Sequence, residues 1–191
     1  MVVLAAMMTS ATAGAEPPPA FTVRLYNGSG VSTPKLLAAR RAIESAFEGS
    51  GVDLTVRPCG RMSESSVDLC DESLKPLEMV VRIIDAPVLN QTVHPDACGV
   101  AYVTEETDRG WLATAFSDRI TSAAVRVGVD AGTLLGLVIS HEVGHLLLGS
   151  RYHGWSGVMR PDWSEELFNQ QREPWRFSAL EVATMRRSRQ F

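Results

Sequence analysis

The sequence predicts a single α+β domain, in which strands dominate the first part of the chain and helices the last. Two observations lead to this fold class. The 191 residues are 45% hydrophobic and 21% charged, which is enough apolar material for one domain with its own core. Short runs of strand composition, interrupted by one helical pattern, occupy the chain up to residue 116, and helical patterns follow them.

The first elements are a strand, a helix and a second strand. Residues 21–26 (FTVRLY) have strand composition and end at a turn-forming Asn-Gly-Ser-Gly cluster. Thr33 and Pro34 predict the start of the helix, because a hydroxyl suits the N-cap and proline suits the first helical position. Apolar residues at helical spacing extend this helix to residue 47, and residues 52–57 then alternate as a strand does.

Three further strands and a short helix are expected in the middle of the chain. Residues 79–84 (MVVRII), 99–103 (GVAYV) and 111–116 have strand composition, and residues 117–127 have a helical pattern. We expect 99–103 at an edge of the sheet, because it stands close before the long helix that follows. Such an edge could pair with an extended peptide.

Three helices are predicted after residue 127. Asp130 can cap a long apolar helix that runs to Gly149. Ser164 can cap a second helix, whose first turn is acidic. The third begins at Ser178, which forms a capping box with Glu181. This order predicts a small twisted mixed sheet with a backing helix, a long buried helix and a C-terminal helix.

The N-terminal residues differ from the rest of the chain. Residues 1–15 contain an apolar run (VVLAAMM), and Ala13 and Ala15 have the arrangement that signal peptidase accepts. We therefore expect a signal peptide over 1–15, a proline-rich spacer over 16–20 and the domain over 21–191, in a secreted or periplasmic protein. No later segment has the ~20 uncharged apolar residues that cross a bilayer, so we expect no membrane span in the mature chain.

The charge of the chain argues against nucleic acid as a partner. The formal net charge is -4. Proteins that bind nucleic acid usually carry a basic face, because their affinity for phosphate comes largely from Lys and Arg. The nearest approach to a basic cluster is three arginines at 186, 187 and 189, which are better explained as favourable charges at the end of a helix.

The chain has three cysteines, which suits one disulfide and one free thiol in an oxidising compartment. Cys59 and Cys70 are the preferred pair, because they flank a polar segment that looks like a loop. A pairing that involves Cys98 stays open. No two cysteines have C-x-x-C spacing, which argues against a zinc site built from thiolates.

The long apolar helix carries an H-E-x-x-H motif formed by His141, Glu142 and His145. Residues four apart lie on one face of a helix, so both imidazoles can reach one metal ion. Glu142 is rotated by about 100° from His141, which places a carboxylate beside the metal as a general base for a water molecule. A polar trio inside an apolar helix would be unfavourable to bury without such a partner. The motif therefore predicts a zinc site.

A catalytic zinc site needs a third protein ligand and one open position. His153 is the leading candidate from the residues alone, because Gly149 can end the helix with a positive φ and let the chain turn back towards the metal. Asp162 is a weaker alternative.

The motif and the residues after it resemble the metzincin branch of zinc peptidases. That family has the pattern H-E-x-x-H-x-x-G-x-x-H and a methionine turn under the metal, although its third histidine follows sooner than in this chain. The matching residues are His141, Glu142, His145, Gly149, His153 and Met159. The stretch also resembles small, little characterised bacterial zincin-like proteins. The resemblance implies a zincin fold, a Zn²⁺ cofactor, peptidase activity and a supporting role for Met159.

A second resemblance offers another third ligand. In thermolysin-like peptidases a glutamate at a similar distance after the second histidine binds the metal, and Glu165 occupies that place here. A position in the acidic first turn of a helix would also explain Glu165.

The sequence thus predicts an exported zinc-dependent endopeptidase that hydrolyses peptide bonds, with Glu142 as the general base. The expected partner is a peptide or protein substrate. Two alternatives stay open: a zincin-fold binding protein that no longer cleaves, and a zinc hydrolase that acts on non-peptide amides. The presence of Glu142 speaks against the first, since a structural zinc site needs no general base.

Overall fold

The computed structural model describes residues 20–60, 70–87, 94–104, 109–170 and 174–187. The expected signal peptide (1–15) and most of the spacer lie outside the described residues. The elements are β1 (Ala20–Asn27), α1 (Thr33–Phe47), β2 (Asp53–Cys59), β3 (Glu78–Ile84), β4 (Gly99–Thr104), β5 (Arg109–Phe116), α2 (Ser117–Val127), α3 (Ala131–Leu148), α4 (Glu165–Gln170) and α5 (Ala179–Arg187). Their order confirms the α+β class.

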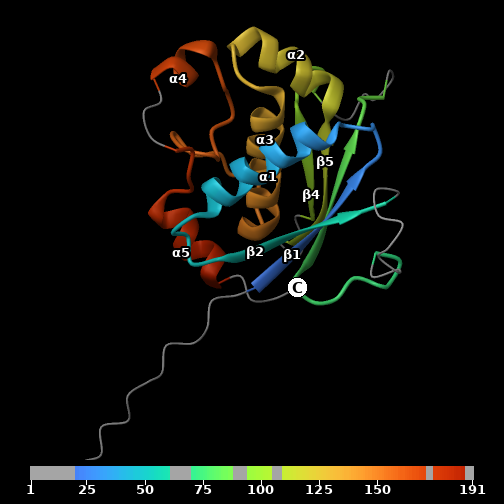
Figure 1. Ribbon diagram of the computed structural model, residues 1–191. Helices are drawn as coiled ribbons and strands as arrows, with labels where there is room; N and C mark the ends of the chain where they lie inside the picture. The colour runs from blue at the N-terminus through green and yellow to red at the C-terminus, as the bar shows by residue number, and fades with distance from the viewer. Residues whose placement is uncertain (1–19, 61–69, 88–93, 105–108, 171–173, 188–191) are drawn as a thin grey trace, which may run out of the picture.

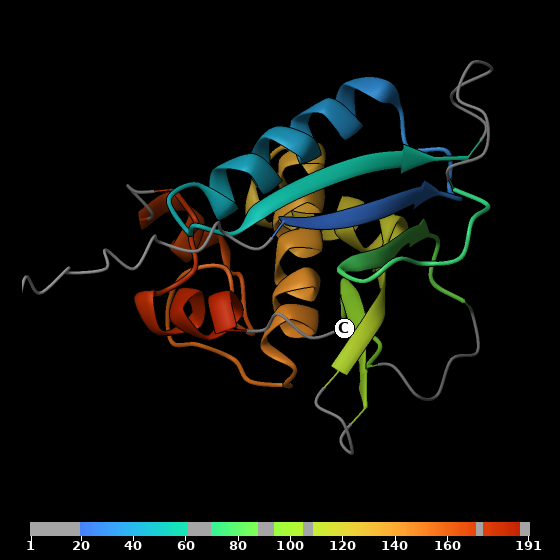
Figure 2. The ribbon, with the colours of Figure 1, turned by 90° about the horizontal axis from the view of Figure 1, so that it is seen from below.

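The five strands form one mixed sheet in the order β2-β1-β3-β5-β4 (Figures 1 and 2). β1 pairs in parallel with β2 and with β3, and β3 pairs in parallel with β5. β4 is antiparallel to β5 and has no strand on its other side within the described part of the chain. The expectation that residues 99–103 form an edge strand is therefore confirmed.

The start of α1 differs from the expectation by one residue. The N-cap is Ser32 and not Thr33, and no side-chain hydrogen bond caps this helix end. Thr33 is the first helical residue, with Pro34 in the first turn. The turn before the helix is instead fixed by Asn27, whose side chain accepts from the Val31 amide at 2.9 Å and donates to its carbonyl at 2.8 Å.

The core lies between one face of the sheet and the helices α1 and α3. Alternate residues of β1 and β3, such as Phe21, Val23 and Val81, are at most 1% exposed. α1 packs against α3, which in turn packs against β5 and β4 (Figure 1). The two helices approach closely because glycine faces α1: a Cβ at Gly136 would lie 2.2 Å from the Ala39 carbonyl oxygen.

α3 alone, among the helices of the described residues, is long and apolar enough to cross a membrane. In this fold 78% of that stretch is buried inside the protein. Its burial against α1 and the sheet accounts for its apolar composition.

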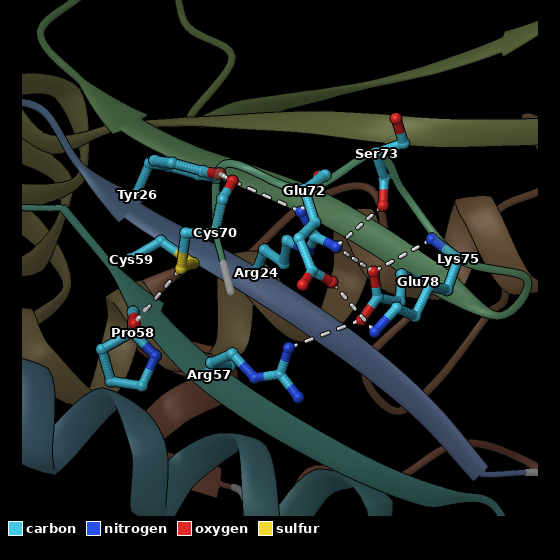
Figure 3. Close-up of polar contacts among 10 residues, drawn as sticks. All are labelled: Arg24, Tyr26, Arg57, Pro58, Cys59, Cys70, Glu72, Ser73, Lys75 and Glu78. Carbon is cyan, nitrogen blue, oxygen red and sulfur yellow. Dashed lines mark hydrogen bonds and ion pairs between the residues drawn. A yellow bond between two sulfur atoms is a disulfide. The ribbon is translucent and has the colours of Figure 1, made fainter. Parts of the chain in front are cut away.

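A buried ion pair holds the opposite face of the sheet (Figure 3). Arg24 of β1 pairs with Glu78 of β3, and their side chains are 2% and 7% exposed. The Arg24 guanidinium also donates to the Cys70, Glu72 and Ser73 carbonyls, at 3.3, 2.6 and 3.2 Å. These bonds fasten the segment before β3 to the sheet.

The same segment is tied to β2 by a covalent bond. The sulfur atoms of Cys59 and Cys70 are bonded, and Cys98 is the free cysteine. The Tyr26 hydroxyl adds a hydrogen bond of 2.8 Å to the Cys70 carbonyl (Figure 3).

Candidate metal centre

α3 brings the two histidines of the motif together. His141 and His145 lie one turn apart, with ring centroids 4.7 Å apart and nearly perpendicular planes. Their Nε2 atoms are 3.1 Å apart. Asp130 caps the helix by accepting from the Thr133 amide at 2.8 Å, which fixes the first turn that leads to this pair.

The other ring nitrogens have partners that set the tautomers. His141 Nδ1 lies 2.8 Å from the Val158 carbonyl oxygen, and His145 Nδ1 lies 2.9 Å from the Ser150 carbonyl oxygen. A carbonyl only accepts, so each Nδ1 must carry the proton and each Nε2 must present a lone pair. Two lone pairs 3.1 Å apart repel unless a cation lies between them, which favours a shared metal ion.

Burial keeps both imidazoles neutral. It lowers the pKa of His141 to about 3, helped by the nearby His145, and lowers the pKa of His145 to about 4. The hydrogen bonds to the carbonyls act in the opposite direction but do not offset the burial. At neutral pH both side chains are therefore in the form that binds a metal.

A left-handed turn after α3 brings in the third histidine. Gly149 has φ 63°, and its amide donates to the His145 carbonyl. The chain then reverses, so that the His153 ring centroid lies 5.2 Å from that of His141 and 4.9 Å from that of His145. One ligand atom from each histidine fits within a group whose members all lie within 4.8 Å of one another.

The other two candidate ligands remain outside this group. Asp162 and Glu165 line the same cleft, but among the described residues the group of metal-binding atoms holds only the three histidines. Asp162 is close enough to His153 to raise its pKa, although burial has the larger effect and lowers it.

Glu142 is buried between α3 and the edge strand β4. A Cβ at Gly99 would lie 2.6 Å from Glu142 Oε1, so only glycine leaves room for the carboxyl group there. Burial raises the pKa of Glu142 to about 8, against the opposing effect of a hydrogen bond from the Ala101 backbone. The raised pKa means that the Glu142 carboxylate, once it has lost its proton, is a stronger base than an exposed glutamate.

Met159 lies directly beneath the histidine-bearing turns of α3. A Cβ at Gly144 would lie 2.4 Å from Met159 Sδ, so the glycine inside the motif is what admits the methionine. The Met159 carbonyl accepts from the Gly154 amide at 2.7 Å, which closes the turn that carries His153. α5 supports this turn, because the buried Glu181 packs against Gly154.

Glu181 also forms the capping box that the sequence predicts. Its carboxylate accepts from the Ser178 amide at 2.7 Å, and the Ser178 hydroxyl accepts from the Glu181 amide at 3.4 Å. One side chain thus both caps α5 and packs beneath the metal-binding turn.

The three histidines and Glu142 open onto a cleft of about 1650 Å³ between β4, α2, α3 and the segment after α3. Trp163, in the wall of this cleft, sets its ring edge-to-face against His141 with centroids 5.9 Å apart. The sequence analysis missed Trp163 and also the contact between Gly99 and Glu142. The only available signal for Trp163 was an aromatic residue close after Met159, and no pattern in the sequence links β4 to the motif.

The donor set fits a zinc ion. Three neutral imidazoles that converge from a helix and the turn after it, with a cleft on the remaining side, are the ligands that zinc accepts when one position stays open. The carbonyl partners of two Nδ1 atoms provide the outer support that such histidines usually have.

No protein-family model matches the chain, and no curated protein matches it. Solved structures with the same architecture exist. A zinc-dependent peptidase from Methanocorpusculum labreanum matches with a TM-score of 0.52 at 13% identity, over 85% of this chain and 99% of the other. Archaemetzincin from Methanopyrus kandleri matches with a TM-score of 0.51 at 17% identity, over 88% of this chain and 95% of the other.

A third structure, metalloproteinase-II from Bacteroides fragilis, is a longer protein. It matches with a TM-score of 0.53 at 16% identity, over 94% of this chain and 56% of the other. The three matches confirm the zincin-like architecture expected from the sequence, and the chain therefore has the fold of archaemetzincin and of the two other proteins.

Proposed function

We propose that this chain is an exported zinc-dependent endopeptidase. The observation that carries the proposal is the convergence of three neutral histidines beside a buried glutamate at the wall of a large cleft. His141, His145 and His153 would hold the ion. The structural neighbours are described as a zinc-dependent peptidase, as archaemetzincin and as metalloproteinase-II.

The proposed chemistry divides between the ion and the protein. When bound, zinc would lower the pKa of a water molecule to about 7 and polarise the scissile carbonyl. Glu142 takes the proton from the attacking water and delivers it to the leaving amine. Burial under β4 suits both steps, because it brings the pKa of Glu142 near the operating pH.

The position of β4 supports a peptide as the substrate. An edge strand beside Glu142 offers backbone donors and acceptors to an extended chain. A peptide paired with β4 would pass in front of the three histidines, since both line one cleft.

Zinc content and proteolysis together test the proposal. Purified protein should hold close to one zinc per chain by elemental mass spectrometry and should cleave unfolded casein. Glu142→Gln should keep the zinc and lose at least ~100-fold in kcat/KM, as removal of a general base does. Equal cleavage by the two proteins would refute the role of Glu142, and zinc without any hydrolysis of peptides or small amides would favour a binding protein.

Export is a separate part of the proposal. It rests on the N-terminal pattern and on the Cys59–Cys70 disulfide, a bond typical of oxidising compartments. We expect the protein in the extracytoplasmic fraction, with its mature N-terminus at Glu16 by mass spectrometry. A full-length chain that stays in the cytoplasm would refute export and leave the enzymatic proposal intact.

A further inference from the structure

The cleft continues from the histidines along the N-terminal half of α3. Leu134, Val138 and Glu142 follow one another at intervals of four residues, so they occupy successive turns on one side of the helix. All three line the cleft. This part, here called the α2–α3 hollow, is completed by Ala123, Arg126 and Val127 of α2 and by Cys98.

The walls of the α2–α3 hollow are apolar. Ala123, Val127, Leu134 and Val138 are hydrophobic and at most 7% exposed. The half-buried Cys98 thiol closes the side next to β4. Walls of this kind favour a side chain whose stem is apolar, because its burial removes hydrocarbon from water.

The α2–α3 hollow contains both Glu142, the proposed catalytic base, and the positively charged Arg126. Burial raises the pKa of the Cys98 thiol, while the charges of Arg126 and Arg119 lower it and that of Glu142 raises it. The thiol therefore lies within electrostatic range of both Glu142 and Arg126. Cys98, Glu142 and Arg126 all line the cleft, so a side chain that binds beside Glu142 shares this cleft with the thiol and the guanidinium.

Two other charged groups near Cys98, Arg119 and Asp118, already have partners. Arg119 donates to the His94 and Ala97 carbonyls, both at 2.9 Å. The Asp118 carboxylate accepts from the Ala86 amide at 2.9 Å.

Arg126 differs from these groups. Among the described residues its exposed side chain makes no hydrogen bond or ion pair, and Asp96, the exposed acid in the same cleft, forms no ion pair with it. A guanidinium at the mouth of an apolar hollow is suited to bind a carboxylate that arrives on an apolar stem.

We propose that the α2–α3 hollow is a specificity pocket that selects a glutamate side chain next to the scissile bond, with Arg126 binding its carboxylate. The proposal rests on the proposed peptidase function and specifies its substrate class. Arg126 then acts on substrate choice, and the hydrolytic step remains with Glu142 and the histidines.

The first test compares fluorogenic peptides that carry Glu, Gln, Leu or Lys on either side of one cleavable bond. At low salt the wild type should cleave the Glu peptide about fivefold faster than the Gln peptide in kcat/KM, and added salt should reduce this preference. Arg126→Gln should abolish the preference, Arg126→Lys should retain most of it, and Arg126→Glu should favour Lys. Arg40→Gln, which removes an exposed arginine of α1, is the charge-matched control.

A second readout does not require turnover. In zinc-loaded Glu142→Gln protein, the Glu peptide should slow alkylation of Cys98 by N-ethylmaleimide, and the added Arg126→Gln substitution should remove that protection. Cleavage without any preference for Glu would overturn the pocket and leave the peptidase function standing. Protection without cleavage of any peptide by the wild type would support the pocket and refute the peptidase function, and failure of both would overturn both.

Discussion

Glu142 is a buried acidic residue, 7% exposed. Its carboxyl group lies between α3 and Gly99, and burial raises its pKa to about 8. Below that pH the folded, metal-free protein keeps a proton that the unfolded chain releases above about 4.5. The buried Glu142 carboxyl group therefore lowers the stability of the metal-free fold as the pH rises from about 4.5 to about 8.

This reasoning predicts that Glu142→Gln stabilises the metal-free protein. The amide has the same shape and carries no charge, so the free energy of unfolding should rise by about 1–3 kcal/mol at pH 8, with little change at pH 4. Urea denaturation of both proteins with a chelator present, from pH 4 to pH 8, measures the difference. A difference that does not grow with pH would contradict the burial of this carboxyl group.

A second prediction at this scale concerns the third ligand. His153→Ala should lower zinc content markedly, because His153 completes the histidine group. Glu165→Gln and Asp162→Asn are the matched controls and should keep close to one zinc per chain. If His153→Ala retained its zinc and Glu165→Gln lost it, the third ligand would be Glu165 and not His153.

Among single residues, the sequence identified those with a recognisable spacing. The motif placed His141, Glu142 and His145 on one helix, and the need for a third ligand singled out His153. It did not reveal Gly99 or Trp163, because their contacts join segments far from the motif or depend on how the chain turns after α3.

Among the elements, α3 combines a structural and a chemical role. Its glycines let other parts of the protein approach its backbone, with α1 at Gly136 and Met159 at Gly144. Sequence patterns located α3 and most other elements, because their apolar periodicity and capping residues are local signals. The N-cap of α1 is Ser32 and not the expected Thr33, because local composition locates a helix end only to within one or two residues.

The tight contact at Gly144 predicts that Gly144→Ala destabilises the protein, although alanine is the better helix former. Its methyl group would lie 2.4 Å from Met159 Sδ and 2.8 Å from the Phe177 ring, so the turn that contains Met159 must move. We expect a loss of about 1–3 kcal/mol and weaker zinc binding, measured by thermal unfolding and by competition with a chromogenic chelator. Val125→Ala, at an exposed position of α2, is the control.

For the molecule as a whole, the two faces of the sheet are stabilised differently. The apolar core packs on one face, and the buried Arg24–Glu78 ion pair lies on the other. Burial alone would raise the pKa of Glu78, but the Lys75 amide and the charges of Arg24 and Arg57 lower it overall. The sequence did not predict this cluster, because it joins strands that lie far apart in the chain. Sheet order and strand pairing were equally beyond local patterns, apart from the edge position of β4.

Glu78→Gln should therefore destabilise the protein and change its response to acid. The variant leaves Arg24 buried without a counter-charge, which costs about 3–5 kcal/mol at pH 7. Because the folded pKa of Glu78 is lowered, its contribution is complete above the unfolded value of about 4.5 and is lost as the pH falls through the folded value. Urea denaturation at pH 7 and pH 3 should show a smaller difference between the proteins at pH 3.

The hydrogen bonds from the histidines to backbone carbonyls link metal binding to the structure of the turn after α3. Val158 and Ser150, which orient His141 and His145, belong to the same turn that supplies His153. Binding of the ion and ordering of this turn are therefore thermodynamically coupled. After chelation, amide hydrogen exchange should accelerate over residues 150–163 and stay slow in β1 and β3. The ion would then order one wall of the cleft, while the sheet keeps its structure without it.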